Sequence, residues 1–109
     1  KQIMSHIIKE KNKEITIDMV LKEVSAHFGV SLSDMRSSKR IRSIILPRQI
    51  AMYLARKMTD SSLVSIGEKF GGKDHATVLH SIRKIESELN VKKELKSTVE
   101  KIAQKLKST

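Results

Sequence analysis

Hydrophobic residues recur at intervals of three and four through most of this chain, which is the spacing of one buried helical face. Leu63, Ile66 and Phe70 form such a face, Gly71 and Gly72 follow it, and a second apolar stripe begins soon after. Glycine accepts positive φ angles at little cost, so the glycine pair predicts a sharp turn between two helices. No alternating run predicts a strand. The expected fold class is therefore all-α, a compact helical domain of about six helices with a helix-turn-helix core.

The second helix of this pair has an apolar side and a polar side. Asp74 is placed to cap its N-terminus, and positions at 100° per residue separate the two sides. A helix that follows a glycine turn and has one apolar side and one polar side has the features of a recognition helix. An ordinary helical hairpin with a solvated face has the same pattern, so the pattern alone leaves both open. The apolar side comprises Val78, Ile82, Ile85 and Leu89, and the polar side comprises Lys73, Thr77, His80 and Lys84.

The remaining helices are expected from caps and apolar stripes. Thr16 is placed to cap a helix that Gly29 ends, and Ser31 begins a short helix in a capping-box arrangement. Pro47 is expected at the first position of the next helix, where its missing N–H would be unpaired in any case. Asn90 is expected to cap the last one. The expected inner faces are Ile17, Val20, Leu21, Val24 and Phe28, then Ile50, Ala51, Leu54, Ala55 and Met58, then Val91, Leu95, Val99, Ile102 and Leu106.

Charge indicates the class of partner. The 109 residues suffice for one small domain, and a formal charge of +10 with a pI near 10.0 favours a polyanion. From Met35 to Thr59 there are basic residues and no acidic one. Residues 37–43 have no sustained helical stripe and precede Pro47, so we expect an extended basic arm. A charge run is usually a solvated face, but an arm beside a helix-turn-helix favours nucleic-acid binding.

Catalysis, metal binding and membrane insertion find little support in the residues. The chain has no cysteine, and His75 and His80 are five apart, so they do not share a helical face as metal-binding pairs do. Gly71-Gly72-Lys73-Asp74 lacks the pattern of a phosphate-binding loop. There is no long apolar span and no signal-peptide core. We therefore expect a cytoplasmic protein domain that is no enzyme, binds no metal and requires no membrane.

Two stretches resemble a known family. Ile66-Gly67 and residues 71–80 closely resemble the C-terminal DNA-binding domain of the bacterial chromosomal replication initiators, the DnaA family. The resemblance continues upstream through residues 38–40, 42–43 and 47–52, in the same order and with matching gaps, and so covers roughly residues 16 to 90. It implies a Trp-repressor-like helix-turn-helix domain over residues 16–109. Residues 1–15 are then expected to be a linker or helical tail of a preceding ATPase domain in a longer protein.

The resemblance also implies which residues contact DNA. The recognition helix is expected in the major groove, and Arg40 of the basic arm, which also carries Arg42, in the adjacent minor groove. Asp74 can accept from cytosine N4, and His75 can bond to base edges. Lysine at 73 and alanine at 76, where the family often has arginine and a hydroxyl residue, leave the base preference open. The major-groove set is Lys73, Asp74, His75, Ala76 and Thr77, and the phosphate-contacting or supporting set is Arg48, Gln49, Arg56, Ser62, Leu63, Val64 and His80.

The expected function is sequence-specific binding of double-stranded DNA at the replication origin, by a domain that is monomeric in isolation. No cofactor is expected for these residues. ATP is expected for the full-length protein, through an upstream domain that this sequence does not contain. Two alternatives stay open: a helix-turn-helix transcription regulator, and a protein-interaction module whose basic face binds an acidic partner.

Overall fold

The structure is a computed structural model, and it describes residues 14–108. Within these residues all regular secondary structure is helical and no strand is present, which confirms the predicted fold class. The expected linker at residues 1–15 falls mostly outside the described residues, but Ile15 packs against the core. The helices are α2 (Ile17–Phe28), α3 (Leu32–Met35), α4 (Arg42–Met58), α5 (Leu63–Lys69), α6 (His75–Leu89) and α7 (Lys93–Lys107).

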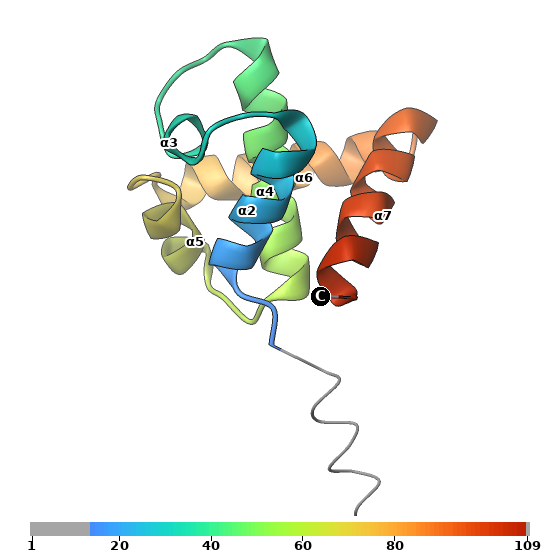
Figure 1. Ribbon diagram of the computed structural model, residues 1–109. Coiled ribbons are helices and arrows are strands. Elements are labelled where there is room, and N and C mark those ends of the chain that lie inside the picture. Colours follow the sequence, from blue (N-terminus) through green and yellow to red (C-terminus); the bar gives the residue numbers. More distant parts are fainter. Residues whose placement is uncertain (1–13, 109) are drawn as a thin grey trace, which may run out of the picture.

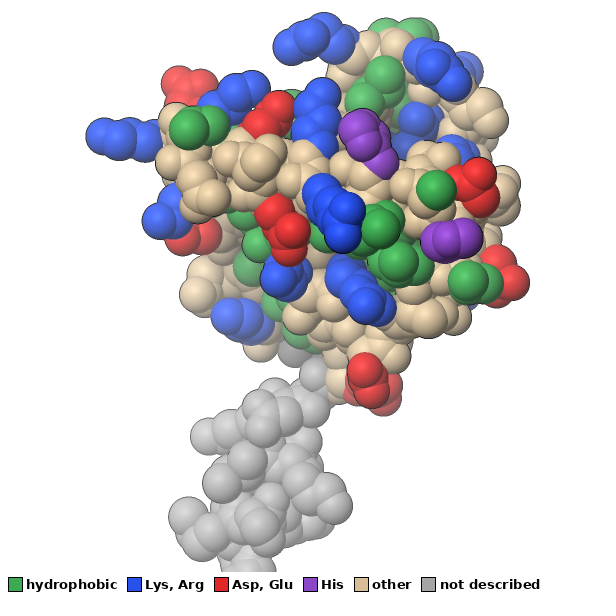
Figure 2. All heavy atoms as spheres, turned by 180° about the vertical axis from the view of Figure 1, so that it is seen from behind, with side chains coloured by type: hydrophobic (Ala, Val, Ile, Leu, Met, Phe, Trp, Pro, Cys, Tyr) green, Lys and Arg blue, Asp and Glu red, His purple; other side chains and the backbone are tan. Residues whose placement is uncertain are grey.

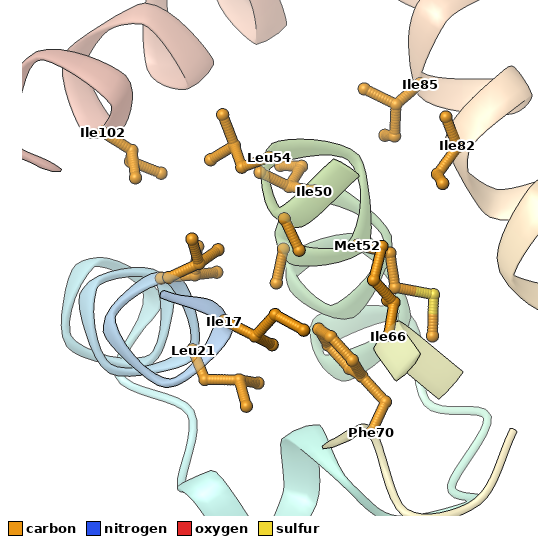
Figure 3. Close-up of a cluster of buried hydrophobic side chains, with 14 of the residues drawn as sticks. Ile17, Leu21, Ile50, Met52, Leu54, Ile66, Phe70, Ile82, Ile85 and Ile102 are labelled. Atoms are coloured by element: carbon orange, nitrogen blue, oxygen red, sulfur yellow. The ribbon is translucent and has the colours of Figure 1, made fainter. Parts of the chain in front are cut away.

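Helix α4 lies at the centre of the domain and contacts α2, α3, α5 and α6 (Figure 1). Helix α6 runs across α4, and α7 closes the core on the side away from α5. Side chains from α2, α4, α5, α6 and α7 point into one shared core (Figure 3). Phe70, at the end of α5, is fully buried there. Packing against this core therefore fixes the inner side of the helix-turn-helix, and the outer side is exposed to solvent.

Most predicted caps are confirmed. The Thr16 hydroxyl accepts the Met19 N–H at 3.1 Å, and the Ser31 hydroxyl accepts the Asp34 N–H at 3.0 Å. Gly29 ends α2 with φ of 67°. Each hydroxyl satisfies one of the N–H groups that a helix start leaves unpaired. The boundaries of α2 and α3 thus follow from short-range chemistry.

The predicted start of α4 is wrong. The helix begins at Arg42, and Pro47 lies inside it rather than at its first position. The Ile41 carbonyl accepts the N–H groups of Ile44 and Ile45 at 2.8 and 2.9 Å, which begins the helix upstream of the proline. Ile44 and Pro47 are both buried, so the core-facing stripe extends across the proline and offsets its missing N–H. The extended part of the arm is accordingly residues 36–41, which we call the basic loop.

The predicted start of the last helix is also wrong. Asn90 is the C-cap of α6, directly after Leu89, and α7 begins at Lys93. The Glu88 carbonyl accepts the N–H groups of Val91 and Lys92 at 3.1 and 2.9 Å, so the chain is still turning at these residues. Val91, expected on the inner face, is 76% exposed. The inner face of α7 begins instead at Leu95. Phe28 and Met58, both expected to be buried, pack against the core while partly exposed.

Candidate nucleic-acid interface

The first turn of α6 presents polar side chains to solvent. Asp74 caps the helix, with its Oδ1 accepting the Thr77 N–H at 2.8 Å. That bond, together with the Thr77 hydroxyl and the charge of His75, holds the pKa of Asp74 below its usual value. His75, Ala76 and Thr77 are exposed, as is His80 one turn later. Because Val78, Ile82 and Ile85 on the opposite side are buried, these exposed residues have a fixed orientation.

The turn between α5 and α6 is unusually tight. The Gly67 carbonyl accepts three N–H groups, from Phe70 at 3.2 Å, Gly72 at 3.0 Å and Lys73 at 2.9 Å. A Cβ added to Gly67 would lie 2.0 Å from the Lys73 carbonyl oxygen. Gly71 and Gly72 have φ of 88° and 86°, as the sequence predicted for a glycine turn. Glycine at 67 is needed for a different reason, close approach of two backbones, which spacing alone did not indicate.

Lys73 is half-buried and bonded within the protein. Its Nζ donates to the Phe70 carbonyl at 2.8 Å and to the Arg36 carbonyl at 3.3 Å. Burial, and secondarily the nearby charge of Arg48, lower the pKa of Lys73. The lysine therefore bridges the helix-turn-helix turn to the basic loop, a role that the sequence did not indicate.

The basic loop carries the one arginine that was expected in a minor groove. Arg40 is exposed, and within residues 14–108 its side chain makes no hydrogen bond or ion pair. Lys39, beside it, pairs with Asp34 at 3.0 Å. Arg42 is exposed at the first residue of α4. Arg40 thus has a guanidinium available for an external acceptor, on a loop that joins α3 to α4.

Arg48 is placed quite differently from Arg40. It is 8% exposed, and its guanidinium donates to the Met35, Lys39 and Asp34 carbonyls and to the Ser37 hydroxyl. Burial lowers the pKa of Arg48, partly opposed by the carboxylate of Asp34. An arginine remains charged at neutral pH even so. Of the two roles that the resemblance allowed, the geometry is that of a supporting residue.

The other expected residues divide between support and exposure. Arg56 is exposed and donates to the Ser61 carbonyl at 2.7 Å, which ties α4 to the segment before α5. The Ser62 hydroxyl caps α5 by accepting the Ser65 N–H at 3.0 Å. Leu63 packs against the core, while Val64 is 57% exposed. Gln49 is half-buried and, with Arg42, lines a cavity of about 670 Å³ bounded by α4, α6 and α7.

Sequence reasoning missed Ser37. Its hydroxyl donates to the Asp34 carbonyl at 2.8 Å and accepts the Lys39 N–H at 3.2 Å, besides accepting from Arg48. The only signal in the sequence is a serine three residues after Asp34, a spacing at which hydroxyls bond local carbonyls. The same spacing occurs in many loops, so it does not identify this residue as the centre of the loop.

The electrostatic character of the surface fits a polyanion. Figure 2 shows lysine and arginine side chains spread over one face, with histidines, hydrophobic side chains and several acidic side chains between them. Among residues 14–108, no three His, Cys, Asp or Glu side chains gather in a way that could hold a metal ion. None of the described helices combines the length and the apolar character that crossing a membrane requires.

The sequence profile described as "Bacterial dnaA protein helix-turn-helix" matches residues 17–85, from the start of α2 to near the end of α6. The chain belongs to this family. The matched DnaA-family segment contains the basic loop, the glycine turn and the exposed tip of α6. The resemblance stated from the sequence is thereby confirmed.

Relatives and a solved structure agree with the DnaA-family assignment. The chain is 47% identical over 106 residues to "Chromosomal replication initiator protein DnaA" of Citrifermentans bemidjiense, covering 97% of this chain and 23% of that protein. It is 45% identical over 108 residues to the protein of the same name in Geotalea daltonii, covering 99% and 24%. A structure titled "Crystal structure of DNA replication initiation factor" superposes with a TM-score of 0.75 at 30% identity, covering 94% of this chain and 31% of that one. The chain thus spans about a quarter of the length of its curated relatives.

Proposed function

We propose that this domain binds double-stranded DNA sequence-specifically, with the tip of α6 in the major groove and the basic loop in the adjacent minor groove. One observation carries the proposal: the glycine turn that leads into the exposed tip of α6 contacts the basic loop, which carries the free guanidinium of Arg40, at the Arg36 carbonyl. Lys73, two residues before the first residue of α6, donates to that carbonyl from the glycine turn. A major-groove helix with a neighbouring minor-groove arm is a recurring arrangement in DNA recognition.

Each side chain at the tip suits a different part of a base pair. His75 and Thr77 can bond to base edges, and the Ala76 methyl can pack on a thymine methyl. Asp74 can accept from cytosine N4 while its Oδ1 caps the helix. Arg42, exposed beside the basic loop, supplies a phosphate contact that carries no sequence information.

The relatives support a biological setting for the proposed binding. Proteins named as chromosomal replication initiators contain this domain as about a quarter of their length, so we place its action at the replication origin, in the cytoplasm. The domain then locates the protein on short DNA boxes, as a monomer and with no cofactor of its own. ATP use belongs to the rest of such a protein.

Selection of bound duplexes from a random pool, followed by titration on the selected box and a scrambled duplex, tests this. We expect one short, non-palindromic box and strong preference over the scrambled sequence. Inverted repeats bound with two-to-one stoichiometry would contradict the monomeric mode and favour a dimeric transcription regulator. Weak binding that ignores sequence would favour an interaction module instead.

A pair of variants tests the placement of α6. Losing a good base contact costs on the order of 1–3 kcal/mol, so His75→Ala should reduce binding to the selected box and leave the scrambled duplex unchanged. Ala76→Thr should be tolerated, because residue 76 is exposed and its methyl makes no hydrogen bond. The reverse ranking would show that α6 lies in the groove differently.

A further inference from the structure

The basic loop needs a support because it has no regular structure of its own between α3 and α4. Its residues Ser38, Lys39 and Arg40 are all exposed, so no side-chain burial fixes their backbone. An unsupported loop would sample many conformations and lose entropy when it entered a groove. The position of Arg40 relative to α6 therefore depends on hydrogen bonds to the loop, in addition to the exposed ion pair of Lys39 with Asp34.

Arg48, on α4, bonds both to the loop and to the residues that lead into it. Its Nε donates to the Met35 carbonyl at 3.2 Å, its Nη1 to the Lys39 carbonyl at 2.9 Å and its Nη2 to the Asp34 carbonyl at 3.1 Å. Its Nη2 also donates to the Ser37 hydroxyl at 3.2 Å. Four of the five N–H donors of a guanidinium are thus used within the protein. The bonds join the residues before the loop to Lys39, which directly precedes Arg40.

A second tether fixes the loop to the turn before α6. The Arg36 carbonyl accepts the Lys73 Nζ at 3.3 Å, and a Cβ added to Gly71 would lie 2.0 Å from that carbonyl oxygen. The loop backbone is therefore in direct contact with the helix-turn-helix turn. Arg48 and this contact together connect Arg40 to α6 through short, specific links.

From these contacts we infer that Arg48 is a positioning residue for DNA recognition: it holds the basic loop so that Arg40 and α6 engage neighbouring grooves in register, and it makes no phosphate contact itself. The inference rests on the proposed function. Arg48 is 8% exposed with its guanidinium directed into the loop, so a phosphate oxygen would have to displace bonds that hold Lys39. Lysine cannot replace it, because an ammonium lacks the planar fork that reaches several carbonyls at once.

The decisive experiment measures how strongly the domain prefers boxes with A/T-rich flanks, whose minor groove is narrow and attracts arginine. Arg40→Ala should remove this preference. Arg48→Lys keeps the charge, yet we expect it to lose the same preference and to bind the A/T-flanked box roughly tenfold more weakly, the order of one lost base contact. Arg83→Lys is the matched control, since Arg83 is exposed on α6 and lies outside the candidate contacts; it should keep the preference.

A double-mutant cycle separates positioning from direct contact. If Arg48 acts through Arg40, Arg48→Lys should change affinity little once Arg40→Ala is present, because coupled residues are not additive. Additive losses, with the flank preference kept in Arg48→Lys, would overturn the inference. Thermal unfolding of each variant, followed by circular dichroism, establishes that the domain remains folded.

A second variant tests the positioning role of Arg48 even if Arg48→Lys unfolds. Ser37→Ala removes an acceptor of Arg48 and the hydroxyl that bonds Lys39, without touching Arg48. It should also lose the flank preference, and retention of that preference would overturn the inference. The proposed function has its own test: it is wrong if the unmodified domain shows no specific binding. If the unmodified domain binds specifically and neither substitution changes the flank preference, only the positioning role of Arg48 is wrong.

Discussion

Gly71 and Gly72 offer a matched pair for measuring how closely the basic loop and the helix-turn-helix turn are joined. Both have positive φ, 88° and 86°, which side-chain-bearing residues rarely adopt. A Cβ at Gly71 would lie 2.0 Å from the Arg36 carbonyl oxygen and 3.0 Å from its carbon, whereas a Cβ at Gly72 would meet nothing within 4 Å. The two alanine variants therefore share the backbone cost and differ only in the clash with the loop.

The expected costs follow from these two facts. Alanine in a left-handed conformation costs roughly 1–2 kcal/mol, and this applies to both variants. Overpacking against atoms that have to move costs typically about 1–3 kcal/mol, and this applies to Gly71→Ala alone. The clash involves backbone on both sides, so no flexible side chain can relieve it. Gly71→Ala should thus be less stable than Gly72→Ala by about 1–3 kcal/mol.

Urea unfolding followed by circular dichroism measures this difference, provided that the denaturant slope is unchanged between variants. For a domain of this size each kcal/mol corresponds to about 4–8 °C in Tm, so thermal unfolding gives an independent value. Gly71→Ala should also lose the A/T-flank preference, because the loop must move away, while Gly72→Ala should keep it. Equal destabilisation with the preference intact in both would refute the close contact between loop and turn.

Two further predictions concern salt and pH. Arg42→Ala should reduce the slope of log affinity against log salt by about 0.9 on specific and scrambled duplexes alike, while Lys101→Ala, outside the candidate contacts, should leave it unchanged; titrations at several salt concentrations check this. The folded-state pKa of Asp74 lies below its usual value. The Asp74 carboxylate therefore stabilises the fold above its unfolded-state pKa of about 3.9. This stabilisation is lost as the pH falls through the lower folded-state pKa. Asp74→Asn keeps a capping oxygen without a charge, so the variant should be less stable than the parent at pH 7. Urea unfolding repeated from pH 7 towards pH 2 should show this difference in unfolding free energy shrinking. A difference that stays constant with pH would contradict the prediction.

Caps and stripes made much of the fold predictable because they act over short distances along the chain. Thr16, Ser31 and Asp74 each bond an N–H three residues ahead, so identity and spacing suffice to place them. The errors at Pro47 and Asn90 have the opposite origin. At Pro47, burial of Ile44 outweighed the preference of proline for the first position of a helix. At Asn90, a turn closed by the Glu88 carbonyl outweighed the preference of asparagine for a helix N-cap. Such outcomes depend on residues brought together only by the fold.

The basic residues show the same limit at the interface. Arg40, Arg42 and Arg48 stand within nine positions of one another and are chemically identical, so composition assigns all three to the same charged surface. Burial separates them: Arg40 and Arg42 are exposed, whereas Arg48 faces the carbonyls at which α3 ends and the loop begins. A helix end leaves carbonyls unpaired, and a planar cation one packed helix away can satisfy several of them. The sequence places the charge near the loop, but only the packing of α3 on α4 directs that charge inward.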